Sequence, residues 1–520
     1  ETTSQPYGIT SYRQAPDGTQ QAVAWKVVGY SVDGGATYTP NKPAWLTALS
    51  VESGNGGTAA EQGTATLTKD VTDLLKVRND GLKNATALGT AAAPYNLSNS
   101  TGATAVQNTA NCYVISAPGH YRIPLVYGNA IKNGATNSNA YETTATGTYV
   151  LQHFKDHNDQ NITNPWIEKS NTANANIDGA KIVWSDEKDL VTSPTIAHVG
   201  GDGYLDFEVK ATDIKSGNAV VAVTKGGTVV WSWHLWFAPK SALNKIEVTN
   251  HQGVKYNFTE ETLGWKPKGE VTTYNAPRTV KVKVEQTIAN GGVKLFTVIN
   301  ITQNNGGKKE GISTHYQFGR KDAFPGMDET KLPQGSINKN AGDNMSITNG
   351  IQNPQNFYTW GGSWYTNPPA GYSYYNLWSA DNTTTGWNDN AVVKTVYDPS
   401  PVGFKMPASN AFTGFTSDGQ YQGTAANINA NGTADSWDKF SAAYGHNFYT
   451  NGSKTATIFF PASGFRNYSD GSLLNVGGDG YYWSAVPYST GNGCGLDFSW
   501  GYVGPQGNYG RSYGFAARPV

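Results

Sequence analysis

Short runs in which apolar and polar residues alternate recur along most of the chain. The strongest run is 229–237 (VVWSWHLWF), in which every second residue from Trp231 onward can share one apolar face. Similar runs lie at 21–30 (QAVAWKVVGY) and 64–71 (TATLTKDV). Because a period of two is typical of strands that bury one face, the sequence predicts a mainly β protein. Helical patterns are confined to 408–415 and 433–444.

One further alternating run lies near the C-terminus. Leu496 and Phe498 alternate with Asp497 and Ser499. A strand that turns Leu496 and Phe498 toward the core must turn its other residues away from it. We therefore expect Leu496 and Phe498 to be buried, and Asp497 and Ser499 to face outward.

The strand-like runs fall into separate groups, and 520 residues are too many for one ordinary core. We expect a β module at 1–75, a second β-sandwich module at 110–240, and an α+β domain at 245–520. The segment 279–301 carries two strand-like runs around an Asn-Gly-Gly turn. This turn signal predicts a β-hairpin inserted in the last domain.

The segment 480–520 mixes two kinds of position. Apolar or structural residues recur from 481–483 to 518–520, and the residues between them are mainly Tyr, Ser, Gly, Asn and Asp. Antibody paratopes use the same composition, because Tyr and Trp supply rigid contact area while Ser, Gly and Asn adapt their hydrogen bonds. We expect the ligand-binding residues to be Tyr488, Ser489, Asn492, Asp497, Ser499, Trp500, Tyr502, Asn508, Tyr509, Ser512 and Tyr513.

This segment resembles the variable region of C-type-lectin-fold proteins that are diversified by retroelements. In those genes, substitutions at template adenines turn Asn codons into codons for Tyr, Ser, Asp, Gly, Thr and similar residues. The candidate residues belong to that set, except that Trp500 does not follow simply from an Asn codon. The resemblance implies a conserved scaffold with a variable binding face. The alternative is an ordinary lectin-like domain with Gly- and Tyr-rich loops.

Three motifs extend the lectin-like resemblance over residues 245–520. They are 398–407 (DPSPVGFKMP), 459–466 (FFPASGFR) and 481–485 (YYWSA). In this order they resemble the paralogous surface domain that is often found with the C-type-lectin-like fold and is related to formylglycine-generating-enzyme-type folds.

The N-terminal runs at 21–30 and 64–71 resemble Ig-like β-sandwich modules on surface proteins of Gram-negative gut bacteria. The spans 111–131 and 217–236 resemble a module that recurs in surface and fimbria-associated proteins of the same bacteria. Taken together, the chain resembles cell-surface or fimbrial tip adhesins of the Bacteroidales type. The resemblance implies two Ig-like modules followed by a C-type-lectin-like domain.

Charge and hydropathy exclude several classes of partner. Charged residues make up 15% of the chain and the formal net charge is −1, so no basic field is available for nucleic acid. No apolar run reaches the ~18 residues of a membrane span, so we expect anchoring to the outer membrane or a pilus instead.

Cys112 and Cys494 are too few for a disulfide framework, and we expect free or buried thiols.

The sequence motifs that would indicate metal binding or catalysis are weak. His153 and His157 (HFKDH) have the spacing of helical metal ligands, but a third ligand is not evident and a solvated loop is favoured. The acidic turns at 200–203 and 477–480 lack the Asp/Asn spacing of an EF-hand. No GxSxG, Walker or GxGxxG motif occurs in a supporting context. We therefore expect no catalytic residue, no metal and no cofactor, and thus no enzyme.

The sequence favours an extracellular, cell-surface adhesin or pilus-tip-type protein. Its ligand is expected to be a protein or glycan on another cell or a host surface, and pilus subunits are further candidate partners. The alternative is a glycan-binding surface lipoprotein of a carbohydrate-uptake system, in which Trp360, Trp364, Trp378 and Trp387 would stack on sugar rings. An enzyme on the lectin-like scaffold is disfavoured, since a fold alone does not establish catalysis.

Overall fold

The computed structural model describes residues 2–68, 71–268, 271–272, 278–303, 310–360, 373–432, 440 and 444–520. Strands account for 41% of the protein and helices for 9%, which confirms the mainly β class. The chain divides into two compact units. The smaller contains Glu1–Leu74 and Glu270–Lys308, and the larger contains Leu75–Gly269 and Lys309–Val520.

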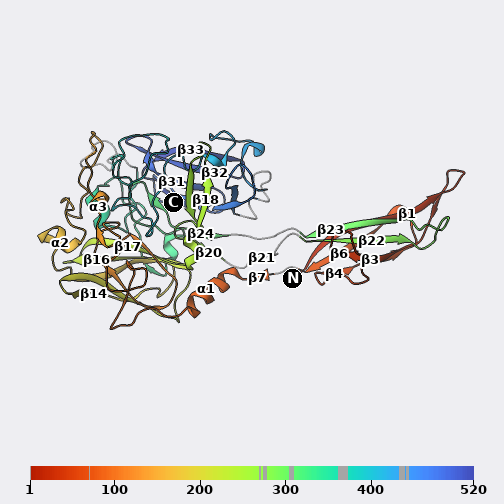
Figure 1. The fold of residues 1–520 in the computed structure, drawn as a ribbon, viewed down its shortest axis with the longest axis horizontal. Coiled ribbons are helices and arrows are strands. Elements are labelled where there is room, and N and C mark those ends of the chain that lie inside the picture. Colours follow the sequence, from red (N-terminus) through yellow and green to blue (C-terminus); the bar gives the residue numbers. More distant parts are fainter. Residues whose placement is uncertain are drawn as a thin grey trace. The chain divides into compact units, whose positions relative to one another are not determined.

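The smaller unit consists of two antiparallel sheets that share one core (Figure 1). One sheet has the order β2-β1-β6-β4, with β1 (Thr2–Gln14), β2 (Gln20–Ala22), β4 (Leu46–Leu49) and β6 (Gly57–Thr68). The other has the order β23-β22-β3-β5, with β3 (Trp25–Ser31), β5 (Ser53–Gly54), β22 (Arg278–Gln286) and β23 (Phe296–Gln303). Alternation along β1 buries Tyr7 and Ile9 against the second sheet, whose Trp25 lies in the same core.

The hairpin expected at 279–301 forms as β22 and β23, but it does not belong with the C-terminal region. Strand β22 pairs with β3, so that Val282 lies opposite Tyr30 and Val284 opposite Val27. The valines of β22 are buried in the core that Trp25 occupies, and this burial holds the hairpin in the smaller unit. The short strands β7 (Val71–Thr72) and β21 (Val271–Thr272) also pair with each other.

The larger unit begins at Leu75, within α1 (Leu74–Asn84), and contains two sheets built mainly from the region 95–237. One has the order β14-β15-β10-β8, with β8 (Tyr95–Asn96), β10 (Gly119–Pro124), β14 (Thr192–Val199) and β15 (Asp202–Val209). The other has the order β26-β13-β16-β17-β9, with β9 (Cys112–Ile115), β13 (Gly179–Ser185), β16 (Gly217–Lys225), β17 (Thr228–Phe237) and β26 (Gln334–Gly335).

Strand β17 is buried on both faces, and the C-terminal region supplies part of its cover. The ring of Trp231 lies 6.4 Å from that of Tyr397, centroid to centroid. On the other face, Nδ1 of His234 is 3.2 Å from the hydroxyl of Tyr316. The regions 110–240 and 245–520 were expected as separate domains, yet they contribute to one continuous core within one compact unit.

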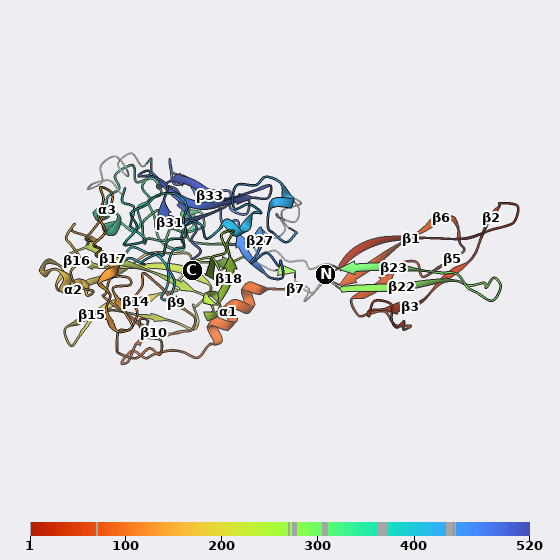
Figure 2. The same cartoon turned by 45° about the horizontal axis from the view of Figure 1, so that its top comes forward.

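The C-terminal region contains several small antiparallel sheets, and Figure 2 labels a strand in some of them. They are formed by β18 (Lys245–Thr249) with β19 (Lys255–Thr259), β20 (Lys266–Pro267) with β24 (Gly311–Ile312), β27 (Gly445–Tyr449) with β28 (Thr457–Pro461), and β25 (Tyr316–Gln317), β34 (Gly514–Phe515), β29 (Phe465–Arg466) and β30 (Leu473–Leu474) in that order. A further sheet consists of β31 (Gly480–Pro487), β32 (Asn492–Ser499) and β33 (Tyr502–Gly510).

The remaining described elements are short. They are β11 (Ile131–Lys132), β12 (Ala135–Thr136), α2 (Ile167–Ser170), α3 (Ile347–Gln352), and the 3-10 turns η1 (Ser138–Ala140), η2 (Thr172–Asn174), η3 (Lys240–Leu243), η4 (Glu329–Lys331), η6 (Thr413–Phe415) and η7 (Ala425–Asn427). No helix within the described ranges is both long and apolar enough to cross a bilayer.

The helix expected at 408–415 is wrong, because only η6 is helical there. Ser409 Oγ donates to the carbonyl of Gly386, and Asn410 Nδ2 donates to Asp389. These bonds join the segment to residues 21 to 23 positions away in the chain, so tertiary contacts override its local helical pattern. The helix expected at 433–444 lies almost entirely outside the described residues.

Candidate binding face

Strands β31, β32 and β33 form an antiparallel sheet (Figure 1). Its inner face packs on an aromatic core. Leu496 and Phe498 are fully buried there, as the alternating pattern predicts. The ring of Phe498 lies 5.5 Å from that of Phe448. Opposite Leu496 on β31, Tyr482 packs on Phe460 with the ring centroids 5.0 Å apart. This core fixes the position of the opposite, outer face of the sheet.

Asp497 lies on the outer face but is not open to solvent, so the expectation that it is free for ligand contact is wrong. Only 7% of the residue is exposed. Its cross-strand partner on β33 is Gly504, and Gly507 lies nearby. A Cβ atom at Gly504 would stand 2.4 Å from Oδ1 of Asp497, and one at Gly507 would stand 2.8 Å from it. The carboxyl group therefore occupies space that these two glycines leave empty.

Tyrosine rings surround this carboxyl group. Burial raises the pKa of Asp497 to about 6, and a hydrogen bond from Tyr509 opposes that rise. Burial and the facing Asp497 carboxylate raise the pKa of Tyr509, which therefore remains a protonated donor at neutral pH. Tyr481 lies opposite Asp497 on β31, and its ring centroid is 5.4 Å from that of Tyr509. Burial also raises the pKa of Tyr481 to about 12.

Exposed aromatic side chains lie at both ends of the sheet. Trp500, in the turn between β32 and β33, is 43% exposed, and Tyr488, between β31 and β32, is 41% exposed. Tyr421 is 63% exposed and stacks on Tyr502 with the centroids 5.7 Å apart. Tyr488 packs against Trp387 at a centroid distance of 5.2 Å. We call these five residues the aromatic rim.

Two members of the aromatic rim are not among the binding residues predicted in the segment 480–520, although Trp387 was considered as a residue that stacks on sugar. Tyr421 reaches the sheet because its neighbour Gln422 forms a β-bridge with Val503 of β33. Trp387 reaches it because the backbone N–H of Gly386 donates to the carbonyl of Pro487. Both lie outside the segment 480–520, and no local pattern in the sequence marks their approach to it.

The polar candidates at the two ends of the sheet form different hydrogen bonds. Asn492 and Asn508 are half-buried, and Nδ2 of Asn492 donates to Oδ1 of Asn508 at 3.0 Å. Oγ of Ser489 accepts from the backbone N–H of Asn492, so it stabilises the turn. Ser499 is half-buried, and its carbonyl accepts a 2.8 Å bond from the ring of His446.

The last candidates belong partly to the scaffold. Ser512 is 4% exposed, so its predicted role in ligand contact is wrong. Its carbonyl accepts from Gln317, which fixes this turn to β25. Tyr509 and Tyr513 are half-buried, with ring centroids 5.3 and 5.4 Å from Phe515. One part of each ring therefore packs on the core, and the other part remains exposed on the outer face.

The structure also gives the positions of the other residues that were considered as metal ligands or nucleophiles. Over the part of the chain that the structure describes, no three His, Cys, Asp or Glu side chains gather as metal ligands. His153 is exposed, whereas His157 is 4% exposed. Cys112 and Cys494 are free and buried, and burial raises the pKa of the Cys494 thiol to about 12. That thiol is therefore protonated at neutral pH and a poor nucleophile.

Comparison with known proteins adds one partial match. The family model described as Domain of unknown function (DUF8237) matches residues 445–520, which include β31, β32 and β33. No curated protein and no solved structure matches the chain.

Proposed function

We propose that the protein is a cell-surface adhesin or pilus-tip-type binding protein that recognises its ligand through the aromatic rim. The observation that carries this proposal is the exposure of Tyr421, Tyr488 and Trp500 around one sheet. Burying such rings against a partner is favourable, and binding energy usually concentrates in a few Trp, Tyr and Arg residues. The amides of Asn492 and Asn508 add hydrogen-bonding groups at the Tyr488 end.

In this proposal the smaller unit is an Ig-like sandwich and the C-terminal region is a C-type-lectin-like domain. The sharing of one core by two antiparallel sheets supports the first assignment. The burial of the motif residues Asp398, Arg466 and Trp483 supports the second, because the residues that carry the resemblance then form scaffold. The rim residues within the segment 480–520, which are Tyr488, Trp500 and Tyr502, would belong to the part that retroelement-driven diversification varies.

The second candidate, a glycan-binding lipoprotein of an uptake system, has less support. Trp378 is fully buried and donates its indole N–H to the carbonyl of Tyr397, so it is closed to stacking on a sugar. Trp364 lies outside the described residues. Trp360 is 60% exposed, and Trp387 packs on Tyr488.

A comparison of variants tests the proposal. Wild-type protein and the Tyr421→Ala/Trp500→Ala variant are labelled and applied to a glycan array and to intact bacterial and mammalian cells. Phe296→Ala removes an equally exposed aromatic ring from the smaller unit and serves as the control. We expect the wild type and the control to bind the same targets and the rim variant to lose them. Equal binding by all three proteins would overturn the proposal.

A further inference from the structure

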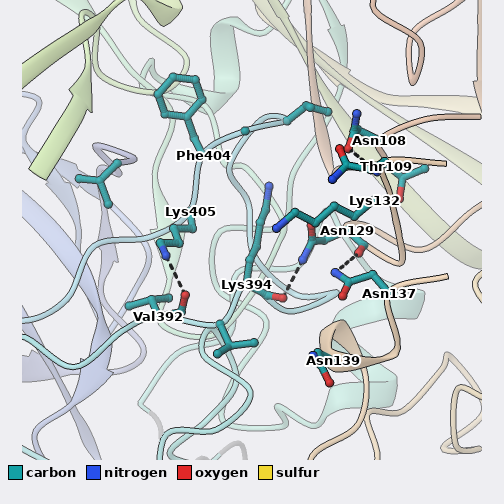
Figure 3. A pocket seen from close by; sticks show the side chains of 15 residues that line it. Asn108, Thr109, Asn129, Lys132, Asn137, Asn139, Val392, Lys394, Phe404 and Lys405 are labelled. Atoms are coloured by element: carbon teal, nitrogen blue, oxygen red, sulfur yellow. Dashed lines mark hydrogen bonds between the residues drawn. The ribbon is translucent and has the colours of Figure 1, made fainter. Parts of the chain in front are cut away.

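The larger unit contains a polar hollow that shares no lining residue with β31, β32 or β33. Its volume is about 600 Å³, within the range of small-molecule sites. One wall comes from the segment 108–139 and the other from 392–405, with Val520 beside them. Figure 3 shows lysine and asparagine side chains facing this space from both walls.

Three ammonium groups meet at this hollow. Lys394 Nζ donates to the carbonyls of Ser400 and Pro401, and Lys405 Nζ donates to that of Val392. An ammonium group has three donors, so Lys394 keeps one and Lys405 keeps two. Lys132 is exposed, and no carboxylate within the described ranges pairs with it.

The lysines are close enough to repel one another. Burial lowers the pKa of Lys405 and the charge of Lys132 lowers it further, while Asp398 partly offsets both effects. Burial and Lys132 also lower the pKa of Lys394, while the buried Asp398 partly offsets the effect. An anion placed between these groups would relieve the repulsion and use their remaining donors.

Asparagines supply the other polar surface of the hollow. Asn129 Nδ2 donates to the carbonyl of Lys394, and Asn137 Nδ2 donates to that of Asn129. These bonds hold both amides in place, and no described donor occupies either amide oxygen. Such oxygens accept from hydroxyl groups, as sugars present them.

A neighbouring hollow extends the site. Its volume is about 300 Å³, and it shares Val392, Gly403, Lys405 and Val520 with the first. It adds Lys245 and Lys255 to the lining. The two hollows therefore adjoin along one wall, and lysines line both.

Carboxylates also lie beside this wall, and they are the buried Asp398, which acts on both Lys394 and Lys405, together with Asp389 and Glu247. Asp389 accepts from Asn250 and from the hydroxyl of Tyr256, and Glu247 pairs with Lys255 at 3.0 Å. No arginine is among the described lining residues, Phe404 is buried, and the half-buried Tyr256 bonds Asp389 through its hydroxyl, so the lining offers few open aromatic faces for stacking nucleobases.

We propose that the two adjoining hollows form one groove that binds an anionic polysaccharide, with lysines holding its carboxylate or sulfate groups and asparagine amides its hydroxyls. A chain ligand fits better than a lone anion because the lysines are spread over both hollows. The groove is distinct from the aromatic rim, so the protein would hold two ligands independently.

Calorimetry on the full chain, tagged at the N-terminus because Val520 lines the groove, tests this proposal. The probes are a polygalacturonate oligosaccharide, a chondroitin sulfate oligosaccharide, a neutral maltooligosaccharide of similar length, single-stranded DNA and inorganic sulfate. We expect one or both acidic saccharides to bind, more weakly as salt rises, and the neutral one to fail. The two acidic probes distinguish carboxylate from sulfate recognition.

Lys132→Gln and Lys405→Gln should each weaken that binding by about tenfold, since each removes a charge-assisted hydrogen bond. Lys132 is exposed, so its variant keeps the fold even if Lys405→Gln does not. Lys188→Gln, at an exposed lysine outside both hollows, should bind as wild type. Trp500→Ala should also leave this binding unchanged, which separates the groove from the rim. No acidic-saccharide binding, equal binding of the neutral saccharide, tighter binding of DNA, or equal loss in Lys188→Gln would overturn the proposal.

Discussion

Asp497 of β32 lies directly opposite Gly504 of β33, and its carboxylate fills the space above that glycine. A Cβ atom at Gly504 would come within 2.4 Å of Oδ1. This pairing makes the buried carboxyl group of Asp497 a structural part of the sheet, although aromatic side chains at both ends of the sheet are exposed. It also divides the candidate residues into those that hold the sheet and those that are available to a ligand.

Gly504→Ala should destabilise the protein by about 1–3 kcal/mol, because the new methyl group forces the Asp497 carboxyl out of its site. Gly501→Ala is the matched control, since a Cβ there meets nothing within 4 Å. Chemical denaturation measures both. In an Asp497→Ala background the cost of Gly504→Ala should shrink. An unchanged cost would show that the two positions are not coupled.

The contribution of Asp497 to stability should fall as the pH rises from about 4 to 6. The pKa of Asp497 is about 6 in the folded protein, and an unfolded Asp titrates near ~3.9. Between these values the folded state binds more protons, so raising the pH favours unfolding, by about 3 kcal/mol in all. Asp497→Asn removes this contribution. Its stability relative to wild type should therefore increase between pH 4 and 7, and parallel stability curves would contradict the burial of the carboxyl group.

Trp500→Ala and Tyr509→Ala should differ in their effect on thermal stability. Trp500 is 43% exposed, whereas the half-buried ring of Tyr509 packs on Phe515 and bonds Asp497. Removing Tyr509 leaves a cavity and an unpaired acid, so its variant should melt several degrees below wild type. Trp500→Ala should change the Tm little. Equal losses would assign Trp500 to the scaffold as well.

The sequence predicted the inner face of the sheet because the burial of Leu496 and Phe498 follows from local alternation. It did not predict the burial of Asp497, which depends on a glycine in the next strand and on surrounding tyrosines. The hairpin at 279–301 was found from its turn, but its pairing with β3 joins segments far apart in the chain. Tyr421 was missed for the same reason, since its approach to Tyr502 depends on tertiary structure.

If the C-terminal face is diversified, variation should follow exposure. Sequencing this locus in sibling strains should show substitutions at Tyr488, Asn492 and Asn508, with Leu496 and Phe498 unchanged. Asp497 and Ser512 are buried and should vary less than the exposed positions. Substitutions spread evenly over core and surface would argue against diversification.

The most direct test of the binding face is the affinity of Tyr421→Ala/Trp500→Ala for the ligand that the array or cell screen identifies. Isothermal titration calorimetry or biolayer interferometry gives the Kd, and a melting curve of the same protein shows whether its thermal stability has changed. We predict that the Kd rises by at least about tenfold while the Tm stays near that of wild type, because these exposed rings contribute to binding more than to the core. An unchanged Kd, or a loss of binding that only follows a lower Tm, would contradict the account.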